Sequence, residues 1–440
     1  MRIVILALGS RGDVQPYLAL SVALKRAGHH PILATHAEFA PLIALYDIEH
    51  RVIEGNPQEL LQSPEGMAWL ASNKNPIRFY RGLMDLARPL ISMMFESVAN
   101  AIHDAEAVIF HPIAVNAFLA ARKRGVPAWM AGLQPWTPTR EFPMALLPLG
   151  IPLPASANYW SQILIEHLLW WPIRHQANAW SLEHLARARM PQPFTAMRKD
   201  KVPVLYAFSE VLMRRPRDWA DHVHVTGYWF LDQPKAYTPP PELVRFLEAG
   251  PKPIYIGFGS MVDRTPDETS HLVVDALEKT GQRCILSQGW SGLANTRNSD
   301  RVLSIGSVPH DWLFPKMSAV VHHGGAGTTA AAMRAGVPAV VVPFFADQHF
   351  WASRVERAGL GPKPVPKHKL NADRLARALS EVVTNQKMRI RAQTAGEVIR
   401  GEDGLARALQ ITGLGERPLV ESRIVRRHPP SASMMESSLF

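Results

Sequence analysis

Short apolar runs alternate with amphipathic stretches along most of the chain. Residues 2–8 are apolar apart from Arg2, residues 9–13 are polar with two glycines, and residues 14–29 carry apolar side chains at helical spacing up to Gly28. The apolar run predicts a buried strand, and the helical spacing predicts a helix packed against it. With a second apolar run at residues 31–36, this order indicates a βα unit of a parallel sheet.

The same alternation continues in two blocks. Further strands are predicted in the first block at residues 107–111, 127–132 and 202–209, and in the second block at residues 253–260, 283–290, 302–309, 319–323 and 339–344. Helical patterns lie between them, with one near residues 271–280 and more at residues 371–411. Strands that alternate with helices predict an α/β fold with parallel sheets.

Two segments interrupt the alternation. Residues 143–198 are rich in Trp, Leu and Ala at helical spacing, and three consecutive prolines follow near residue 240. The prolines mark a linker. We therefore predict a first domain at residues 1–234, a linker at 235–250, a second domain at 251–414 and a loose tail at 415–440. Two such domains place their strand ends across an interdomain cleft.

Composition fits a folded protein. The chain has 440 residues, 47% of them hydrophobic and 20% charged, and a single cysteine, Cys284. One cysteine excludes an internal disulfide and a cysteine-rich metal site, and with no signal peptide recognised it favours a cytoplasmic location. The apolar segment 160–173 contains Glu166 and His167 and is too short to span a bilayer.

The net charge of +10 suggests two kinds of anionic partner, nucleic acid and an anionic membrane. Lys and Arg are scattered, and no nucleic-acid motif accompanies them. We therefore expect no nucleic acid partner and leave peripheral membrane contact open.

A glycine-rich loop follows the predicted strand at residues 319–323. Gly324, Gly325 and Gly327 precede a predicted helix that begins near Thr328. Glycines allow a ligand to approach the backbone, and a helix N-terminus offers unpaired N–H groups, so this segment predicts an anion cradle with His323 beside it. The alternative is a tight turn whose glycines serve packing.

Three more loops follow strands of the second block. Asp347 and Gln348 suit the adjacent hydroxyls of a sugar, although Asp347 is equally a helix N-cap. Ser260 suits a phosphate, or an ordinary turn. Trp290 suits stacking on a nucleobase, with residues 308–310 at its edge, or core packing. Together these loops predict a site for a nucleoside diphosphate that carries a sugar.

Four segments carry a family resemblance, namely residues 9–20 ("GSRGDVQPYLAL"), 225–232 ("VTGYWFLD"), 322–329 ("HHGGAGTT") and 335–348 ("AGVPAVVVPFFADQ"). The chain resembles the glycosyltransferases of GT-B fold up to about residue 411. Within them it is similar to the nucleotide-sugar-dependent group that contains sterol 3β-glucosyltransferases and macrolide and glycopeptide-antibiotic transferases. The resemblance implies two Rossmann-like domains that face an interdomain cleft.

The resemblance also implies roles for residues of the second block. The implied diphosphate ligands are His323 and the backbone of Gly325, Ala326, Gly327 and Thr328. The implied sugar ligands are Asp347 and Gln348, in a pair that resembles glucose-using members, and the implied phosphate and nucleoside ligands are Ser260, Trp290, Val308 and His310.

Asp13 is the candidate catalytic base. It lies at the entry of the first predicted helix, where a carboxylate could take the proton of an attacking hydroxyl if burial raises its pKa from about 3.9. The family resemblance implies the same role, and helix capping is the alternative. His36 and His111 each end a predicted strand and are interpreted as structural. No metal-ligand spacing is present, so we expect no metal cofactor.

We therefore predict an inverting hexosyltransferase that moves glucose from a UDP-sugar to a hydroxyl of a lipophilic acceptor such as a sterol, terpenoid or polyketide. The apolar region 159–180 is interpreted as core, with an acceptor pocket as the alternative. Two functions stay open, namely a transferase that uses a dTDP-sugar on an antibiotic aglycone and a non-catalytic nucleotide-sugar-binding protein. A dinucleotide-dependent oxidoreductase is disfavoured because residues 9–12 lack the full G-x-G-x-x-G pattern.

Overall fold

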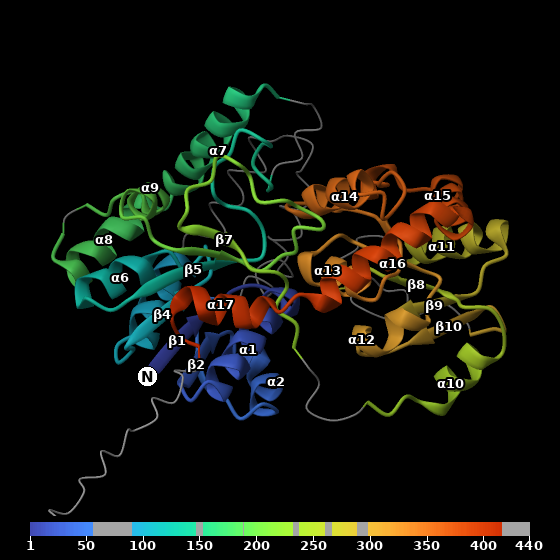
Figure 1. Ribbon diagram of the computed structural model, residues 1–440, viewed down its shortest axis with the longest axis horizontal. Helices are drawn as coiled ribbons and strands as arrows, with labels where there is room; N and C mark the ends of the chain where they lie inside the picture. The colour runs from blue at the N-terminus through green and yellow to red at the C-terminus, as the bar shows by residue number, and fades with distance from the viewer. Residues whose placement is uncertain are drawn as a thin grey trace, which may run out of the picture.

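The structure is a computed structural model that describes residues 1–55, 90–146, 153–187, 189–231, 237–259, 266–287 and 298–415. Figure 1 shows two groups of parallel strands covered by helices, with the N-terminal half in blue to green and the C-terminal half in yellow to red. Within the described residues the α/β fold predicted from the sequence is confirmed.

The first sheet has seven parallel strands among the described residues, in the order β3-β2-β1-β4-β5-β6-β7. Their bounds are β1 (Arg2–Leu6), β2 (His30–Thr35), β3 (Glu49–Val52), β4 (Ala107–Phe110), β5 (Ala128–Gly132), β6 (Val204–Tyr206) and β7 (Val223–Val225). The sequence missed the two edge strands. β3 is polar and partly exposed and β7 has three residues, so neither presents an apolar run.

The second sheet has the described strand order β10-β9-β8-β11-β12, again parallel. Its strands are β8 (Ile254–Gly257), β9 (Cys284–Ser287), β10 (Val302–Ile305), β11 (Ala319–His322) and β12 (Ala339–Val341). Each lies inside a range predicted from the sequence. The strands are apolar along most of their length because helices cover both faces of a parallel sheet.

The helices of the first half are α1 (Arg11–Arg26), α2 (Ala40–Ala44), α6 (Asn116–Arg124), α7 (Ala155–Trp170), α8 (Arg174–Leu185) and α9 (Pro193–Lys199), with the 3₁₀ turn η1 (Ala37–Phe39). Residues 90–101 are also helical. The first helix begins at Arg11, three residues earlier than predicted, so Asp13 lies inside its first turn.

The helices of the second half are α10 (Pro241–Glu248), α11 (Pro266–Thr280), α12 (His310–Leu313), α13 (Ala326–Arg334), α14 (Gln348–Arg357), α15 (Ala372–Thr384), α16 (Gln386–Gly401) and α17 (Gly404–Thr412), with the 3₁₀ turns η3 (Phe314–Lys316) and η4 (Lys367–Lys369). Among the helices of the described ranges, none is both long and apolar enough to cross a bilayer.

The last helix, α17, packs on the first sheet. Ala408, Leu409 and Leu414 are buried in one cluster with Ile3 and Ile5 of β1. The imidazole Nε2 of His29 lies 3.0 Å from the carbonyl oxygen of Leu414. Residues 404–414, which the sequence assigned to the second domain, therefore contribute to the core of the first half. Of the tail predicted at residues 415–440, residues 416–440 lie outside the described residues.

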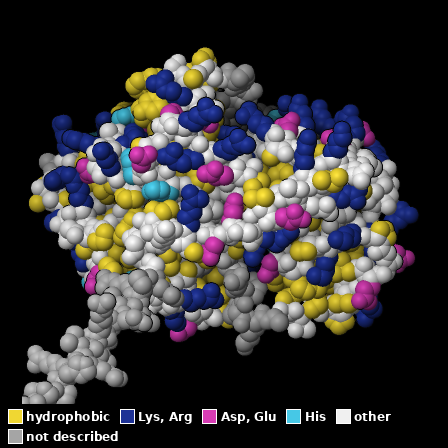
Figure 2. All heavy atoms as spheres, in the orientation of Figure 1, with side chains coloured by type: hydrophobic (Ala, Val, Ile, Leu, Met, Phe, Trp, Pro, Cys, Tyr) yellow, Lys and Arg dark blue, Asp and Glu magenta, His cyan; other side chains and the backbone are white. Residues whose placement is uncertain are grey.

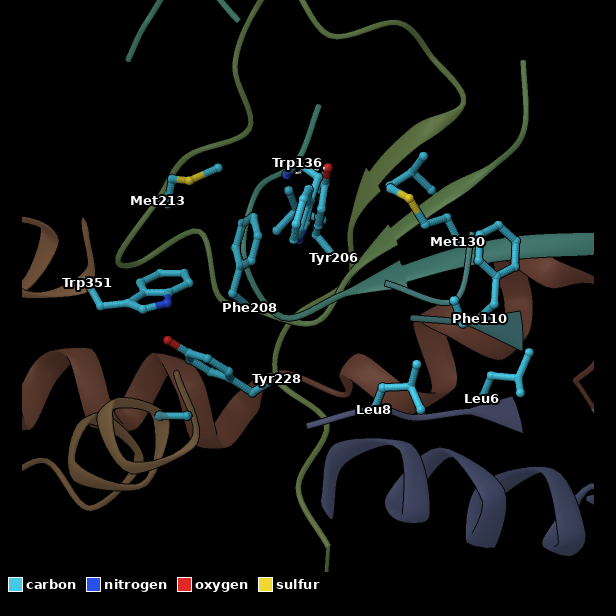
Figure 3. Close-up of a cluster of buried hydrophobic side chains, with 14 of the residues drawn as sticks. Leu6, Leu8, Phe110, Met130, Trp136, Tyr206, Phe208, Met213, Tyr228 and Trp351 are labelled. Atoms are coloured by element: carbon cyan, nitrogen blue, oxygen red, sulfur yellow. Dashed lines mark hydrogen bonds between the residues drawn. The ribbon is translucent and has the colours of Figure 1, made fainter. Parts of the chain in front are cut away.

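One buried cluster also joins the two halves. The ring of Phe208, which follows β6, meets that of Trp351 in α14 edge-on, with centroids 5.6 Å apart. Figure 3 shows these two side chains side by side, with Tyr228 and Met213 near them. This packing holds the strand ends of the two sheets close to one another.

Candidate active site

The site lies where the strand order reverses in both sheets. In the first sheet the reversal falls between β1 and β4, and in the second it falls between β8 and β11. Ligands of open α/β sheets bind outside the carboxyl ends of the strands at such a point, because the neighbouring connections leave on opposite faces.

We call these two reversals of strand order the switch points of the sheets. They face each other through the first turns of α1 and α13. A Cβ added to Gly327 would lie 3.4 Å from the carbonyl oxygen of Gly12. Helix N-termini carry partial positive charge and unpaired N–H groups, so two of them that meet form a favourable place for an anion.

His323 stands at the centre of the second switch point. A Cβ added to Gly325 would collide with its Nε2, and one added to Gly259 would lie 3.1 Å from its Cε1. These two glycines therefore leave the space that the imidazole occupies. Burial lowers the pKa of His323 to about 4, so the ring is neutral at pH 7. Its Nδ1 has no hydrogen-bond partner among the described residues.

The first turn of α13 supplies the predicted cradle. The N–H of Thr329 donates to the carbonyl oxygen of Gly325 at 3.0 Å and is the first intrahelical bond. The N–H groups of Ala326, Gly327 and Thr328 precede that bond and are therefore open to a ligand. The Thr329 hydroxyl also donates to Gly325, at 2.9 Å, which directs its proton away from a ligand.

Asp13 combines the two roles that the sequence left open. Its Oδ2 accepts hydrogen bonds from the N–H and the hydroxyl of Ser10, at 2.8 and 2.9 Å, and so caps α1. Its Oδ1 has no hydrogen-bond partner in the described part of the chain. Burial raises the pKa of Asp13, while the bonds from Ser10 partly oppose that shift. Gly9, at φ +128°, leaves room for the carboxylate, since a Cβ there would lie 2.5 Å from Oδ2.

Asp347 occupies the N-cap position of α14, but its side chain makes no capping hydrogen bond, so the capping alternative holds for its position only. Its Oδ2 accepts a hydrogen bond from the indole Nε1 of Trp351 at 3.2 Å. Burial raises the pKa of Asp347 to about 7, and the negative charge of Asp13 adds to the shift. That electrostatic coupling means that the candidate base and the candidate sugar ligand lie close together across the cleft.

Gln348 is buried and holds its own loop in shape. Its Oε1 accepts hydrogen bonds from the N–H groups of Phe344 and Phe345, at 2.8 and 3.3 Å. The carboxamide oxygen is therefore engaged with the loop backbone. A direct role on a sugar would therefore fall to the Nε2 amide group, and the sequence pattern could not show this division.

The predicted nucleoside side is partly described. His310 begins α12, and its ring is stacked on that of Phe314, with centroids 4.2 Å apart. Burial lowers the pKa of His310 to about 4, with smaller contributions from Arg11 and His323. Val308 is partly exposed in the loop before α12. Ser260 and Trp290 lie outside the described residues.

Tyr17 and His111 also line the first switch point, and we had not assigned either to the site. The Tyr17 hydroxyl donates to the carbonyl oxygen of Ala131 at 2.5 Å, and its ring meets that of His111 with centroids 6.0 Å apart. His111 Nδ1 accepts the N–H of Ile113 at 3.2 Å, so the ring proton is on Nε2. The spacing of four residues from Asp13 places Tyr17 on the same face of α1 and is a usable signal.

One group of side chains in the described ranges could hold a metal ion, namely Glu96, Glu183 and His184. His184 Nε2 lies 2.8 Å from Glu96 Oε1, so this contact is also explained as an ion pair. Figure 1 places α8, which carries Glu183 and His184, at the opposite side of the first sheet from α13. The group is separate from the candidate site.

Each half of the chain matches a model of a known protein domain. A model of the glycosyltransferase family 28 N-terminal domain matches residues 3–143. A model of the erythromycin biosynthesis protein CIII-like C-terminal domain matches residues 274–401. These ranges contain Asp13 and the loops of His323 and Asp347.

Two curated relatives are sterol 3-beta-glucosyltransferases. That of Pichia angusta is 39% identical over 421 residues, which are 93% of this chain and 33% of the relative. That of Emericella nidulans is 37% identical over 424 residues, which are 93% of this chain and 30% of the relative. The chain therefore spans about a third of the length of the curated relatives it matches.

Solved structures support the fold. The glycotransferase of kitacinnamycin has a TM-score of 0.68 at 17% identity, covering 94% of this chain and 98% of that one. A calicheamicin glycosyltransferase has a TM-score of 0.65 at 17% identity, covering 94% and 98%. The glycosyltransferase VinC in complex with dTDP has a TM-score of 0.64 at 17% identity, covering 95% and 100%. The chain is thus similar in sequence to sterol 3-beta-glucosyltransferases, and it has the two-sheet GT-B fold of the solved glycosyltransferases.

Proposed function

We propose that this chain transfers glucose from UDP-glucose to the hydroxyl of a lipophilic alcohol, with a sterol as the first choice. The observation that carries the proposal is the meeting of two switch points, with Asp13 on one side and the first turn of α13 with His323 on the other. A base for the acceptor and a cradle for the leaving group are the two parts that such a transfer requires.

The proposed step is a single displacement. The acceptor oxygen forms a bond to C1 of the sugar as the bond from C1 to the diphosphate oxygen breaks, so the configuration at C1 inverts. The acceptor proton passes to Oδ1 of Asp13, while Ser10 continues to hold Oδ2. A raised pKa makes this carboxylate a better proton acceptor than an exposed aspartate.

The leaving diphosphate takes the electron pair and gains negative charge. The open N–H groups of Ala326, Gly327 and Thr328 and the positive end of α13 stabilise that charge. His323 is neutral, so it acts as a hydrogen-bond partner rather than as a cation. In this proposal no metal ion is required, because the helix end supplies the stabilisation.

The acceptor class is supported by the relatives rather than by a pocket. Sterol 3-beta-glucosyltransferases are 37 to 39% identical to nearly the whole chain, whereas the structures of antibiotic glycosyltransferases are 17% identical. A sterol is therefore favoured over a polyketide. The same names favour glucose, which agrees with the Asp347–Gln348 pair.

The test crosses two donors, UDP-glucose and dTDP-glucose, with a sterol, a terpenoid alcohol and a polyketide aglycone, and reads products by mass spectrometry. We expect a sterol glucoside from UDP-glucose, with the β configuration shown by the coupling constant of the anomeric proton. If only dTDP-glucose gave a product, the donor would be dTDP-glucose and not UDP-glucose. UDP binding without any product on the three acceptors would favour the non-catalytic alternative.

A further inference from the structure

Helix α7 is inverted relative to the usual arrangement of an amphipathic helix. Its polar residues Asn158, Gln162 and Glu166, spaced by four, are buried, with at most 6% exposure. Its apolar residues Trp160 and Leu164 are 65% and 58% exposed. A surface helix normally buries its apolar stripe and exposes its polar one.

Each of the three buried polar side chains makes hydrogen bonds to the neighbouring structure, through the amide nitrogens of Asn158 and Gln162 and through the carboxylate of Glu166. Asn158 Nδ2 donates to the carbonyl oxygen of Arg140 at 3.0 Å, and Gln162 Nε2 donates to that of Phe142 at 2.8 Å. Both carboxylate oxygens of Glu166 accept from the guanidinium of Arg198, at 2.7 and 2.8 Å. These bonds fix the orientation of α7, so the apolar side cannot turn inward without loss of the bonds.

The outward side forms a continuous stripe. Trp160, Leu164, Leu168 and Trp171 recur every three or four residues, so they share one face of the helix. Leu168 is 43% and Trp171 61% exposed. We call this set the α7 stripe. In Figure 1 α7 projects from the body at the top of the view, and Figure 2 shows apolar side chains exposed over it with Lys or Arg side chains among them.

Positive charge lies at both ends of the α7 stripe. The guanidinium of Arg140 lies 5.9 Å from the ring centroid of Tyr159, and that of Arg174 lies 5.1 Å from the ring of Trp171. The acidic residues between positions 153 and 187 are Glu166, which is paired with Arg198, and Glu183. The chain as a whole carries a net charge of +10.

We propose that the α7 stripe docks the protein on the surface of an anionic lipid bilayer, with α7 lying in the plane of the interface. A 16-residue helix with one apolar face is suited to that position, tryptophan prefers the interfacial layer, and arginines at the edges meet anionic headgroups. The inference does not rest on sugar transfer, because the stripe is outside the candidate site. It does agree with a lipophilic acceptor, which would be delivered from the same bilayer.

The test measures flotation of the full chain with vesicles of phosphatidylcholine alone and of phosphatidylcholine mixed with phosphatidylserine, which supplies the negative surface potential of an anionic leaflet. We expect binding to the anionic vesicles. The triple variant Trp160→Ser, Leu164→Ser, Trp171→Ser should bind the vesicles with an affinity lower by about tenfold or more, because it removes most of the inserted apolar surface. The variant Arg140→Gln, Arg174→Gln should lose the preference for anionic vesicles.

The matched control is Ile390→Ser, Val398→Ser. These residues are 53% and 51% exposed on α16, so the control removes exposed apolar side chains at another place and should leave binding unchanged. Retained UDP binding in calorimetry establishes that each variant is folded. Quenching of wild-type tryptophan fluorescence by brominated lipid gives a measurement that needs no variant.

Three outcomes would overturn the proposal. They are absence of wild-type binding and quenching, a triple variant that binds as the wild type does, and a wild-type dimer in light scattering that becomes a monomer in the triple variant. The last result would assign the α7 stripe to a second copy of the chain. Because UDP binding and glucose transfer are measured separately, failure here is distinguishable from failure of the proposed transfer.

Discussion

Asp13 is both a helix cap and the proposed base, and a single substitution can separate the two. In Asp13→Asn the side-chain oxygen can still accept from the N–H of Ser10, so α1 keeps its cap. The amide cannot take the acceptor proton. We expect kcat to fall by about 10² to 10⁴, the usual contribution of a general base, with UDP affinity unchanged.

Steady-state kinetics with UDP-glucose and calorimetry with UDP measure the two effects of Asp13→Asn. Asp13→Ala serves as the comparison, because it removes the cap as well and should also lower stability by about 0.5 to 2 kcal/mol. Normal turnover in Asp13→Asn would remove this residue from the proton transfer.

Asp347 makes stability depend on pH in a direction that can be checked. Its pKa is about 7 in the folded protein, against an ordinary value of 3.8, so the folded state holds the proton more tightly. The stabilisation is complete below about pH 4 and is lost as the pH rises towards 7. Asp347→Asn should therefore melt close to the wild type at pH 4 and at a higher temperature at pH 8.

Thermal melts of the ligand-free protein at the two pH values test this expectation. Asp373→Asn is the control, since Lys279 lowers the pKa of Asp373 and its replacement should not raise stability at pH 8. If Asp347→Asn were less stable than the wild type at pH 8, the ionised carboxylate of Asp347 would not destabilise the folded wild-type protein at that pH.

At the scale of single residues, the sequence patterns predicted where candidate site residues lie in the fold better than they predicted which side chains these residues contact. Motif spacing placed Asp13 at the entry of the first helix and His323 at the end of a strand, and both lie at the switch points. It could not show that Gln348 bonds its own loop, or that His111 ends beside Tyr17, because such contacts depend on side-chain directions and on segments far apart in the chain.

At the scale of elements, the loop after β11 is shaped around one imidazole. Gly325 has an ordinary φ of −61°, so alanine fits its backbone, but the added Cβ would collide with His323. Gly325→Ala should displace the ring and weaken UDP binding by about tenfold, near the value of one lost hydrogen bond to a charged group. Its melting temperature should also fall.

A double variant distinguishes collision from a general defect. His323→Ala removes the ring, so Gly325→Ala combined with His323→Ala should melt higher than Gly325→Ala alone while UDP binding stays weak. Gly401→Ala on α16 is the control, because its Cβ would meet no atom within 4 Å. Independent, additive changes in melting temperature would contradict the collision.

The inverted face of α7 marks a limit of pattern analysis at the same scale. Apolar residues at helical spacing predicted a helix correctly at residues 155–170, and we interpreted the stripe as core. The interpretation was wrong for Trp160 and Leu164, which point outward. Periodicity is the same for either orientation. Hydrogen bonds from the polar face to Phe142 and Arg198, which are not part of α7, determine which face is buried.

At the scale of the whole molecule, the sequence predicted two parallel sheets but could not predict how they dock. The return of α17 to the first sheet and the contact of Gly12 with Gly327 join segments about 300 to 400 residues apart. No local pattern encodes such pairs. They determine, however, whether the base and the anion cradle share one cleft.

A contact between the halves offers a direct test of that docking. Phe142, in the segment after β5, lies 5.3 Å from the ring of Phe350 in α14, and the guanidinium of Arg354 lies 4.8 Å from Phe142 and 4.7 Å from Phe350. A partly buried cation over an aromatic ring contributes about 0.5 to 2 kcal/mol. We therefore expect a coupling of that size between Phe142→Ala and Arg354→Ala in the free energy of denaturant unfolding, measured with both single variants and the double variant.

The neighbouring Arg357 is exposed, so the effects of Phe142→Ala and Arg357→Ala on the free energy of unfolding should be additive. Since Phe142 and Arg354 come from different halves, a coupling near zero would mean that these halves do not meet at this contact in solution, and the proximity of Asp13 and Asp347 would lose its support.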